Sequence, residues 1–190
     1  HQVRPGDPYE LSEGYTVERM PVVERHGRAK LRAGHMLASD PQVAGAGIDI
    51  GVEFNDGKNL RAPDVSVGAI SDRPGFSHAL PPLAVEFADV GQDEPELQRK
   101  IRELLAHGTR YVWVVRMQGP RRVEVYERGH KVKVYGADAE LRAEGVLQNP
   151  VPVLAFYEED QAHEVTLRNL LQRRGIERLA ALREEARKDG

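Results

Sequence analysis

The sequence has no cysteine among its 190 residues. Disulfide bridges, zinc–thiolate sites and cysteine nucleophiles are therefore excluded. The sequence also has no apolar run long enough to span a bilayer, and it lacks the basic and apolar regions of a secretory signal. We therefore expect a protein that does not enter a membrane and that resides in the cytoplasm.

Several common catalytic motifs are missing as well. The seven histidines form no His-x-x-x-His or His-Glu-x-x-His pattern, so the ligand spacing of a zinc enzyme is absent. The segment Gly45-Ala46-Gly47 lacks the lysine and the spacing of a phosphate-binding loop. The Gly-x-Ser-x-Gly turn of many serine hydrolases does not occur. The sequence therefore gives no support to these three classes of enzyme.

A strong positive charge, which nucleic-acid-binding domains often carry, is also absent, because the formal net charge is −3. Between residues 99 and 133, however, arginine and lysine clearly outnumber the acidic residues. A local excess of this kind can contact phosphates. The alternative is that these residues form the solvated faces of a helix and a hairpin. The side chains that we expect to contact a nucleic acid are Arg99, Arg102, Arg121 and Arg122.

Hydrophobic periodicity predicts an α/β fold, in which helices flank a mixed β-sheet. Residues 83–88 are apolar on both sides except at position 86, which is typical of a central strand. Residues 93–95 supply the capping residue, the acid and the proline of a helix start. The expected elements are a strand at 15–20, a helix at 21–39, strands at 48–54, 64–70 and 83–88, a helix from 93–95 to 107, a strand at 111–117, a hairpin at 123–126 and 132–135, a strand at 151–156 and a helix from 166.

We divide the chain into a loosely ordered polar arm over 1–14, an α/β domain over 15–163 and a C-terminal helix over 164–190. The leucines after Thr166 recur at three- and four-residue spacings, which is typical of an amphipathic helix. This helix either supports a homodimer or packs on its own domain. The acidic run at 158–160 before it is most simply a solvated turn.

Three charged residues interrupt otherwise apolar segments. Asp64 begins a predicted strand, Glu86 lies in the middle of another, and Lys100 falls beside the apolar stripe of the next helix. Two carboxylates and a lysine are the groups that metal-dependent phosphodiester hydrolysis uses. Each residue also has a structural alternative: Asp64 in a turn, Glu86 in a buried ion pair with an arginine of the first helix, and Lys100 in a surface pair with Glu96.

These motifs resemble those of the Uma2 (DUF820) family, a branch of the PD-(D/E)XK nuclease superfamily, over residues 10–160. Pro63-Asp64-Val65 is similar to the Pro-Asp strand of the family, and Val85-Glu86-Phe87 is similar to its Val-Glu-Val strand. Glu96-Leu97 followed by Lys100 resembles its Asp-Leu-x-x-Lys helix start, with glutamate in place of the commoner aspartate.

The resemblance continues outside these motifs. Residues 108–115 and 122–126 are similar to the two strands that follow in the family, and His26 stands where members often carry a histidine on the first helix. The chain departs from the superfamily at Ala88, because the usual lysine two residues after the glutamate is absent. It departs from the family at Asp89-Val90, where Ser-Pro is usual.

The resemblance implies a restriction-endonuclease-like fold and a nuclease site that uses Mg²⁺ or Mn²⁺. Carried over to this chain, Asp64 and Glu86 are the expected metal ligands, with the Phe87 carbonyl as a possible third. Lys100 is the expected catalytic lysine, and His26 and Glu96 are auxiliary. We therefore expect a divalent-metal-dependent endonuclease that acts on DNA. The alternative is a catalytically inactive nuclease-fold module that binds protein or nucleic acid.

Overall fold

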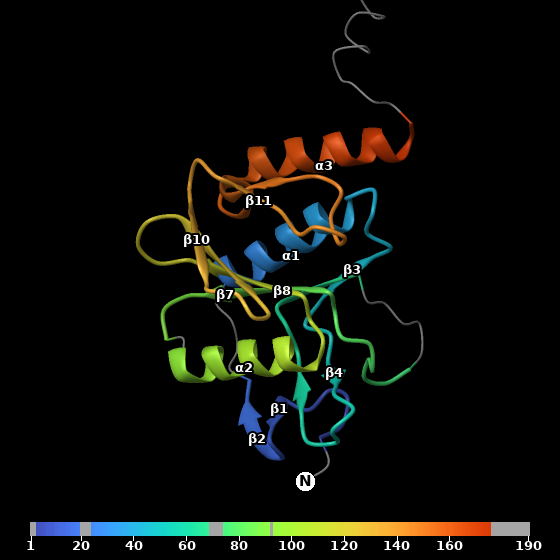
Figure 1. Cartoon of the computed structure of the whole chain (residues 1–190), viewed down its shortest axis with the longest axis vertical. Helices are drawn as coiled ribbons and strands as arrows, with labels where there is room; N and C mark the ends of the chain where they lie inside the picture. Colours follow the sequence, from blue (N-terminus) through green and yellow to red (C-terminus); the bar gives the residue numbers. More distant parts are fainter. Residues whose placement is uncertain (1–2, 20–23, 69–73, 92, 176–190) are drawn as a thin grey trace, which may run out of the picture.

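The structure is a computed structural model, and it describes residues 3–19, 24–68, 74–91 and 93–175. Its centre is a six-stranded mixed sheet in the order β10-β9-β8-β7-β6-β3 (Figure 1). Strands β7 and β8 run parallel, and the other neighbours in this sheet run antiparallel. The six strands are β3 (Ala46–Ile48), β6 (Val65–Val67), β7 (Leu83–Ala88), β8 (Tyr111–Arg116), β9 (Arg122–Glu127) and β10 (Lys133–Gly136).

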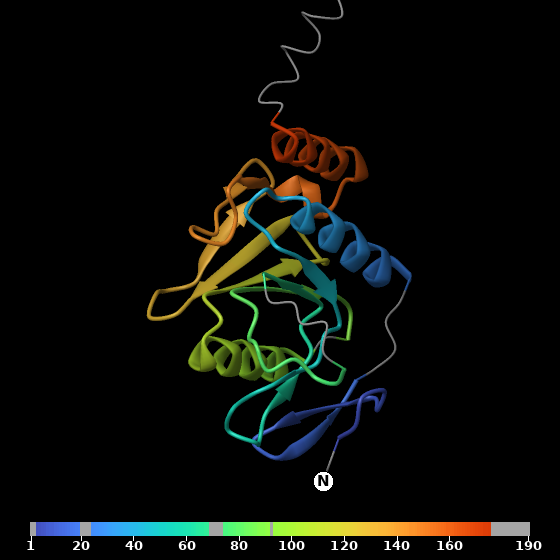
Figure 2. The ribbon, with the colours of Figure 1, turned by 90° about the vertical axis from the view of Figure 1, so that its right-hand side faces the viewer.

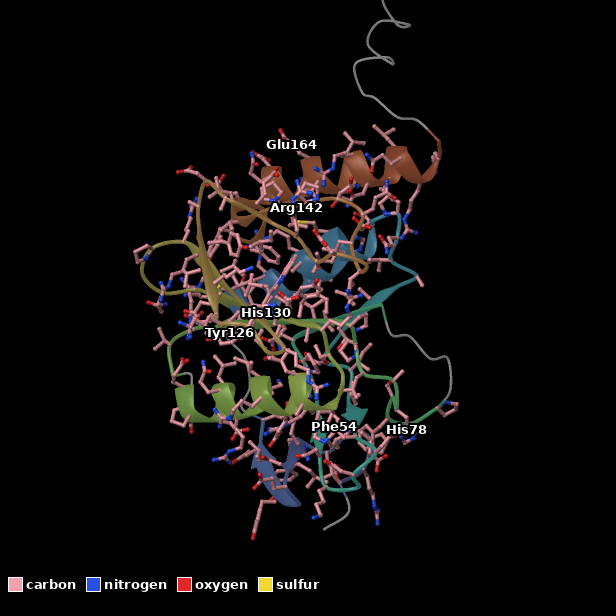
Figure 3. The ribbon with its side chains drawn as sticks, in the orientation of Figure 1. Phe54, His78, Tyr126, His130, Arg142 and Glu164 are labelled. Carbon is pink, nitrogen blue, oxygen red and sulfur yellow. The ribbon has the colours of Figure 1, made fainter. Side chains whose placement is uncertain are left out.

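Helices cover both faces of this sheet. Helix α1 (Glu24–Ala38) packs on one face and carries α3 (Glu159–Arg173) on its outer side, and α2 (Glu94–His107) covers the other face (Figures 1 and 2). Figure 3 shows the side chains that fill these layers, with Tyr126 on the α2 side of the sheet and Glu164 on the outer helix α3. The α/β fold with a mixed sheet and a C-terminal helix, predicted from the sequence, is therefore confirmed.

Strand β7 separates two apolar cores because its side chains alternate between the faces of the sheet. Leu83, Val85 and Phe87 belong to the larger core, under α1. Ala84 and Ala88 belong to the smaller core, under α2. Glu86 lies between these two alanines in the alternation, so its carboxylate points to the α2 side.

Helix α2 connects β7 to the parallel strand β8 and begins as the sequence predicts. Asp93 caps its amino end, where the side chain accepts a hydrogen bond from the Glu96 N–H at 3.1 Å, and Pro95 follows in the first turn. Gly108, at φ 129°, ends the helix and donates its N–H to the Leu104 carbonyl. This fixed start places Lys100 in the second turn, beside the strand that carries Glu86.

A smaller sheet, in the order β2-β1-β5-β4, lies below α2 in Figure 1 and at the bottom of Figure 2. It contains the hairpin of β1 (Tyr9–Ser12) and β2 (Tyr15–Glu18), together with β5 (Leu60–Arg61) and β4 (Val52–Glu53). The buried residues of the hairpin are polar: Glu10 and Ser12. Polar contacts therefore attach the hairpin to the rest of the chain. A third sheet pairs β11 (Glu140–Leu141) with β12 (Val151–Pro152).

The structure corrects several predicted boundaries near the amino end. The arm expected over 1–14 is not loose at 9–12, because Glu10 and Ser12 of β1 find buried partners on β5 and α2. The strand expected over 48–54 is broken, because Asp49 takes a φ of 54° and turns the chain between β3 and β4. Residues 69–70 of the strand expected at 64–70 lie outside the described residues.

Other corrections concern the C-terminal region. Only residues 151–152 of the strand expected over 151–156 pair, and the short 3₁₀ helix η1 (Val153–Phe156) follows. The expected turn at 158–160 is the start of α3, where acidic side chains interact favourably with the helix dipole. Helix α3 buries Val165 against its own chain and leaves Leu167 and Leu170 exposed. Its role in a homodimer stays a prediction, and residues 176–190 lie outside the described part.

In the part of the chain that the structure describes, no helix is long and apolar enough to cross a membrane.

Candidate active site

The site is built where β6 and β7 meet. These strands pair antiparallel, with Val65 opposite Val85. If this register is continued by one residue, Asp64 stands opposite Glu86. Both acids line a cavity of about 320 Å³, and the cavity also contains Lys100 of α2, as the sequence predicts. Side chains from the hairpin and from α1 complete its wall, notably Glu10, Arg19, His26 and Lys30.

Asp64 is surrounded by hydrogen-bond donors. Its Oδ2 accepts the Phe87 N–H at 2.7 Å and lies 3.2 Å from His26 Nε2, and its Oδ1 lies 2.7 Å from Lys30 Nζ. Burial opposes the charge of this carboxylate, but the hydrogen bond from His26 and the charges of Lys100 and Lys30 hold its pKa well below the ordinary value. Asp64 is therefore ionised at neutral pH.

Glu86 has fewer partners. Lys100 Nζ lies 2.9 Å from Oε1 and donates a hydrogen bond to Oε2 at 3.1 Å. The buried Oε1 accepts no well-oriented hydrogen bond from the described residues. Burial, opposed in part by Lys100, raises the pKa of Glu86 to about 8, and the negative charges of Asp64 and Glu10 act in the same direction. The two carboxylates thus influence each other, as neighbours in one site do.

Lys100 points into the cavity rather than out to solvent. Besides Glu86, its ammonium group donates to the Ala62 carbonyl at 2.8 Å and to Glu10 at 3.4 Å. Burial opposes the charge of Lys100, but Glu10, Glu86 and Asp64 raise its pKa above the ordinary value. Lys100 does not form the surface ion pair with Glu96 that was the structural alternative in the sequence analysis. A lysine of α2, rather than an arginine of the first helix, is the buried partner of Glu86.

Glu96, expected to be auxiliary, lines the cavity and also belongs to a cluster around Arg61 of β5, and its auxiliary role stays a prediction. Arg61 is fully buried, and its guanidinium group lies 2.6 Å from Glu96, 2.5 Å from Glu103 and 3.2 Å from Glu10. Glu10 therefore joins this cluster to Lys100 and the cavity. Our sequence reasoning missed Arg61 because β5 is a two-residue strand with no periodic pattern around it.

Lys30 of α1 was also missed. It is 4% exposed, and it lies 2.7 Å from Asp64 and 2.9 Å from Asp49. A signal was present in the sequence, since Lys30 falls between Ala29 and Ala33 on the buried side of the helix and four residues after His26. In Figure 2, the amino-terminal end of α1 is the end nearer the hairpin, which brings His26 and Lys30 to this site.

The arginines expected to bind nucleic acid do not line the cavity. Arg99 and Arg102 are exposed on α2, and Arg99 lies 3.3 Å from Glu96. Arg121 forms an ion pair with Glu158, and Arg122 lies 3.9 Å from Glu124. Any contact that they make with a nucleic acid is therefore separate from the carboxylates, and their role stays a prediction.

The carboxylates fit a hard divalent cation. Among the described residues, no group of three or more histidine, aspartate or glutamate side chains could hold a metal ion. Mg²⁺ does not require such a group, because it is commonly held by one or two carboxylates and retains several water ligands. The Oε1 atom of Glu86 is buried and faces the Lys100 ammonium group at 2.9 Å without a well-oriented hydrogen bond, so a cation at this oxygen would share it with that lysine. Asp64 and Glu86 therefore suit Mg²⁺ or Mn²⁺ better than Zn²⁺.

Comparisons with known proteins identify the family and the fold of the chain. A family model described as "Uma2: Putative restriction endonuclease" matches residues 1–155. A crystal structure from Anabaena variabilis ATCC 29413, titled as that of "a putative nuclease belonging to DUF820", matches with a TM-score of 0.69 at 17% sequence identity, covering 81% of this chain and 90% of that one. At this identity the likeness establishes a shared fold. No curated protein sequence matches significantly.

Proposed function

Since the chain belongs to the Uma2 family, we propose that it is a divalent-metal-dependent endonuclease that hydrolyses phosphodiester bonds of DNA. One observation carries the proposal: Asp64, Glu86 and Lys100, which stand far apart in the sequence, line the same cavity. The donors around Asp64 keep it charged, and the carboxylate of Glu86, whose buried partner is Lys100, offers a second oxygen ligand.

Each residue of the site has a definable role in this reaction. Asp64 and Glu86 would hold Mg²⁺ or Mn²⁺, which polarises a phosphoryl oxygen and lowers the pKa of a bound water. Glu86 must lose its proton to bind the ion. The pKa of Lys100 is also raised, so this lysine stays charged at neutral pH. It would therefore neutralise developing negative charge or orient the attacking water rather than remove a proton.

His26 acts on Asp64 rather than on substrate in this scheme. Its ring lies against Phe87, with ring centroids 5.9 Å apart, and this contact keeps Nε2 beside Asp64. It is therefore a positioning residue for the first carboxylate. Glu96 acts indirectly in this scheme, because from its position on α2 it forms an ion pair with the buried Arg61.

A plasmid-nicking assay tests the proposal. Wild type is expected to convert supercoiled DNA to open circles with Mg²⁺ or Mn²⁺ and to stop on chelation. Asp64→Asn is expected to abolish this activity, while Glu164→Gln, an exposed change on α3 far from the cavity (Figure 3), should leave it intact. Equal nicking by wild type and Asp64→Asn would show that the cavity is not the active site.

The inactive nuclease-fold module remains a second candidate for one reason: the ammonium groups of Lys30 and Lys100 already lie against both carboxylates. In such a module, DNA binding would not depend on a divalent cation. Binding of a labelled duplex to wild type and Asp64→Asn, in Ca²⁺ and in chelator, separates the two functions. Retained binding without cleavage under any metal would favour the module.

A further inference from the structure

A buried lysine stands against the oxygen that a metal ion would use. Lys30 Nζ lies 2.7 Å from Asp64 Oδ1, while the other oxygen of Asp64 is engaged by the Phe87 N–H and His26. A divalent cation binds carboxylate oxygens at about 2.0–2.6 Å. Both cations cannot approach Oδ1 closely, since like charges at such distances repel strongly in a buried site.

Asp49 offers the same ammonium group a second acceptor. Its Oδ1 lies 2.9 Å from Lys30 Nζ and 2.6 Å from Arg19 Nη2. Its Oδ2 accepts no hydrogen bond from the described residues, and the side chain is 37% exposed. Asp49 also has a left-handed backbone, with a φ of 54°, a conformation that costs energy for residues other than glycine and often marks functional positions.

The space around this pair allows the ammonium group to move. A second cavity, of about 510 Å³, adjoins the first and is lined by Lys30, Asp49 and Arg19. Lys30 lines both cavities, with Asp64 on one side and Asp49 on the other. A small rotation of a flexible lysine side chain could therefore exchange Asp64 for Asp49 without exposing the charge or leaving it unpaired.

We propose that Lys30 is a resident counter-ion that competes with the divalent cation for Asp64, and that Asp49 receives its ammonium group when the cation binds. Lys30 and Asp49 are thus positioning residues that set the metal affinity of the site. This inference rests on the proposed function, because it requires Asp64 to be a metal ligand.

The two residues predict opposite effects on metal affinity. Titration of the full chain with Mn²⁺, followed by calorimetry, gives the dissociation constant directly and needs no catalysis. Lys30→Met removes the competing charge, so Mn²⁺ should bind roughly tenfold more tightly than to wild type. Asp49→Asn keeps a residue that tolerates the left-handed backbone but removes the negative charge that attracts the ammonium group, so binding should weaken by a factor of about 3 to 10.

Two further variants isolate the mechanism. Arg28→Met removes the same charge from an exposed position of α1 and should leave the dissociation constant unchanged. Asp49→Asn introduced into Lys30→Met should leave the dissociation constant of Mn²⁺ nearly unchanged. Without the Lys30 ammonium group, Asp49 has no competing cation to hold away from Asp64. An equal effect of Asp49→Asn with and without Lys30 would overturn the exchange and leave only a general charge effect.

The outcomes also separate this inference from the proposed function. If Asp64→Asn binds Mn²⁺ as tightly as wild type does, the assignment of Asp64 as a metal ligand is wrong, and the proposed function fails with it. If Asp64→Asn loses binding but Lys30→Met does not gain it, the site stands and the competition is wrong. Thermal unfolding shows whether each variant is folded. Should Lys30→Met fail to fold, Asp49→Asn decides alone, and an unchanged dissociation constant there overturns the proposal.

Discussion

The two sides of the cavity treat their carboxylates differently. On the α1 side, Asp64 receives a backbone N–H, a histidine and a lysine, and its pKa is lowered. On the α2 side, Glu86 shares a single lysine with Glu10, and its pKa is raised to about 8. Both side chains are buried, with residue exposures of 9% and 5%. Burial opposes the charge of both acids, and the additional donors around Asp64 are what lower its pKa while that of Glu86 is raised.

Their places on the strands explain this difference. Asp64 precedes β6, at a strand end where the backbone of β7 and the side chains of α1 can both reach it. Glu86 is central in β7, flanked on its own face by Ala84 and Ala88, which offer no side-chain donor. Only a long side chain from the helix opposite can reach it. The first position favours a permanent charge, and the second favours a group that gains and loses a proton.

The largest effect is expected on the α2 side, from Arg61→Met. This change leaves Glu10, Glu96 and Glu103 without their shared buried cation, and removing one partner of a buried ion cluster costs about 3–5 kcal/mol. Urea unfolding measures the loss. Arg121→Met, which removes an exposed ion pair, should cost at most about 1 kcal/mol. Similar losses for the two variants would mean that the Arg61 cluster does not hold the α2 side together.

Lys100→Ala is expected to abolish nicking while the circular-dichroism spectrum is retained. The loss should be at least about 100-fold, because a charge that stabilises the transition state disappears from a buried site. Lys100→Arg tests the geometry, since it keeps the charge but not the compact ammonium group. Wild-type nicking by Lys100→Ala would reduce this lysine to an ion-pair partner of Glu86.

The two carboxylates should give opposite pH dependence of stability. The pKa of Glu86 is raised from 4.5 to about 8, so the folded state holds its proton more tightly, and this contribution to stability is lost as the pH rises through that range. The pKa of Asp64 is lowered from 3.8, so its contribution is present above that value and is lost as the pH falls.

Unfolding free energies of two variants, measured against pH, check these signs. Relative to wild type, Glu86→Gln should lose less stability between about pH 5 and 8. Asp64→Asn should lose less below about pH 4. If the unfolding free energy of Glu86→Gln follows that of wild type across the neutral range, Glu86 is ionised in the folded protein, and the contrast between the two sides disappears.

The smallest effect is expected for His26→Gln on the α1 side. Asp64 keeps Lys30 and the Phe87 N–H, so the loss of one hydrogen bond should cost about 0.5–1.5 kcal/mol. Nicking should fall by less than about tenfold, the rate equivalent of that energy. His163→Gln, at an exposed position of α3, is the matched control. A loss of activity as complete as that of Asp64→Asn would give His26 a direct catalytic role.

The sequence predicts the centre of this site better than its surroundings. Asp64, Glu86 and Lys100 were found because each is a charge within an apolar pattern, and such interruptions are visible locally. Arg61 and Asp49 were not found, because their burial and their partners depend on contacts between segments far apart in the chain. Strand β1 of the hairpin was not predicted either. Its buried residues are polar, so the strand shows no hydrophobic alternation in the sequence.

The polar attachment of this hairpin has a consequence for hydrogen exchange. None of the described residues 3–19 contributes an apolar side chain to the buried core, and the pair Leu11–Leu60 joins β1 to β5. Local opening of β1 and β2 thus exposes little apolar surface and should need far less free energy than global unfolding. We expect their amides to exchange much faster than those of β7 and β8.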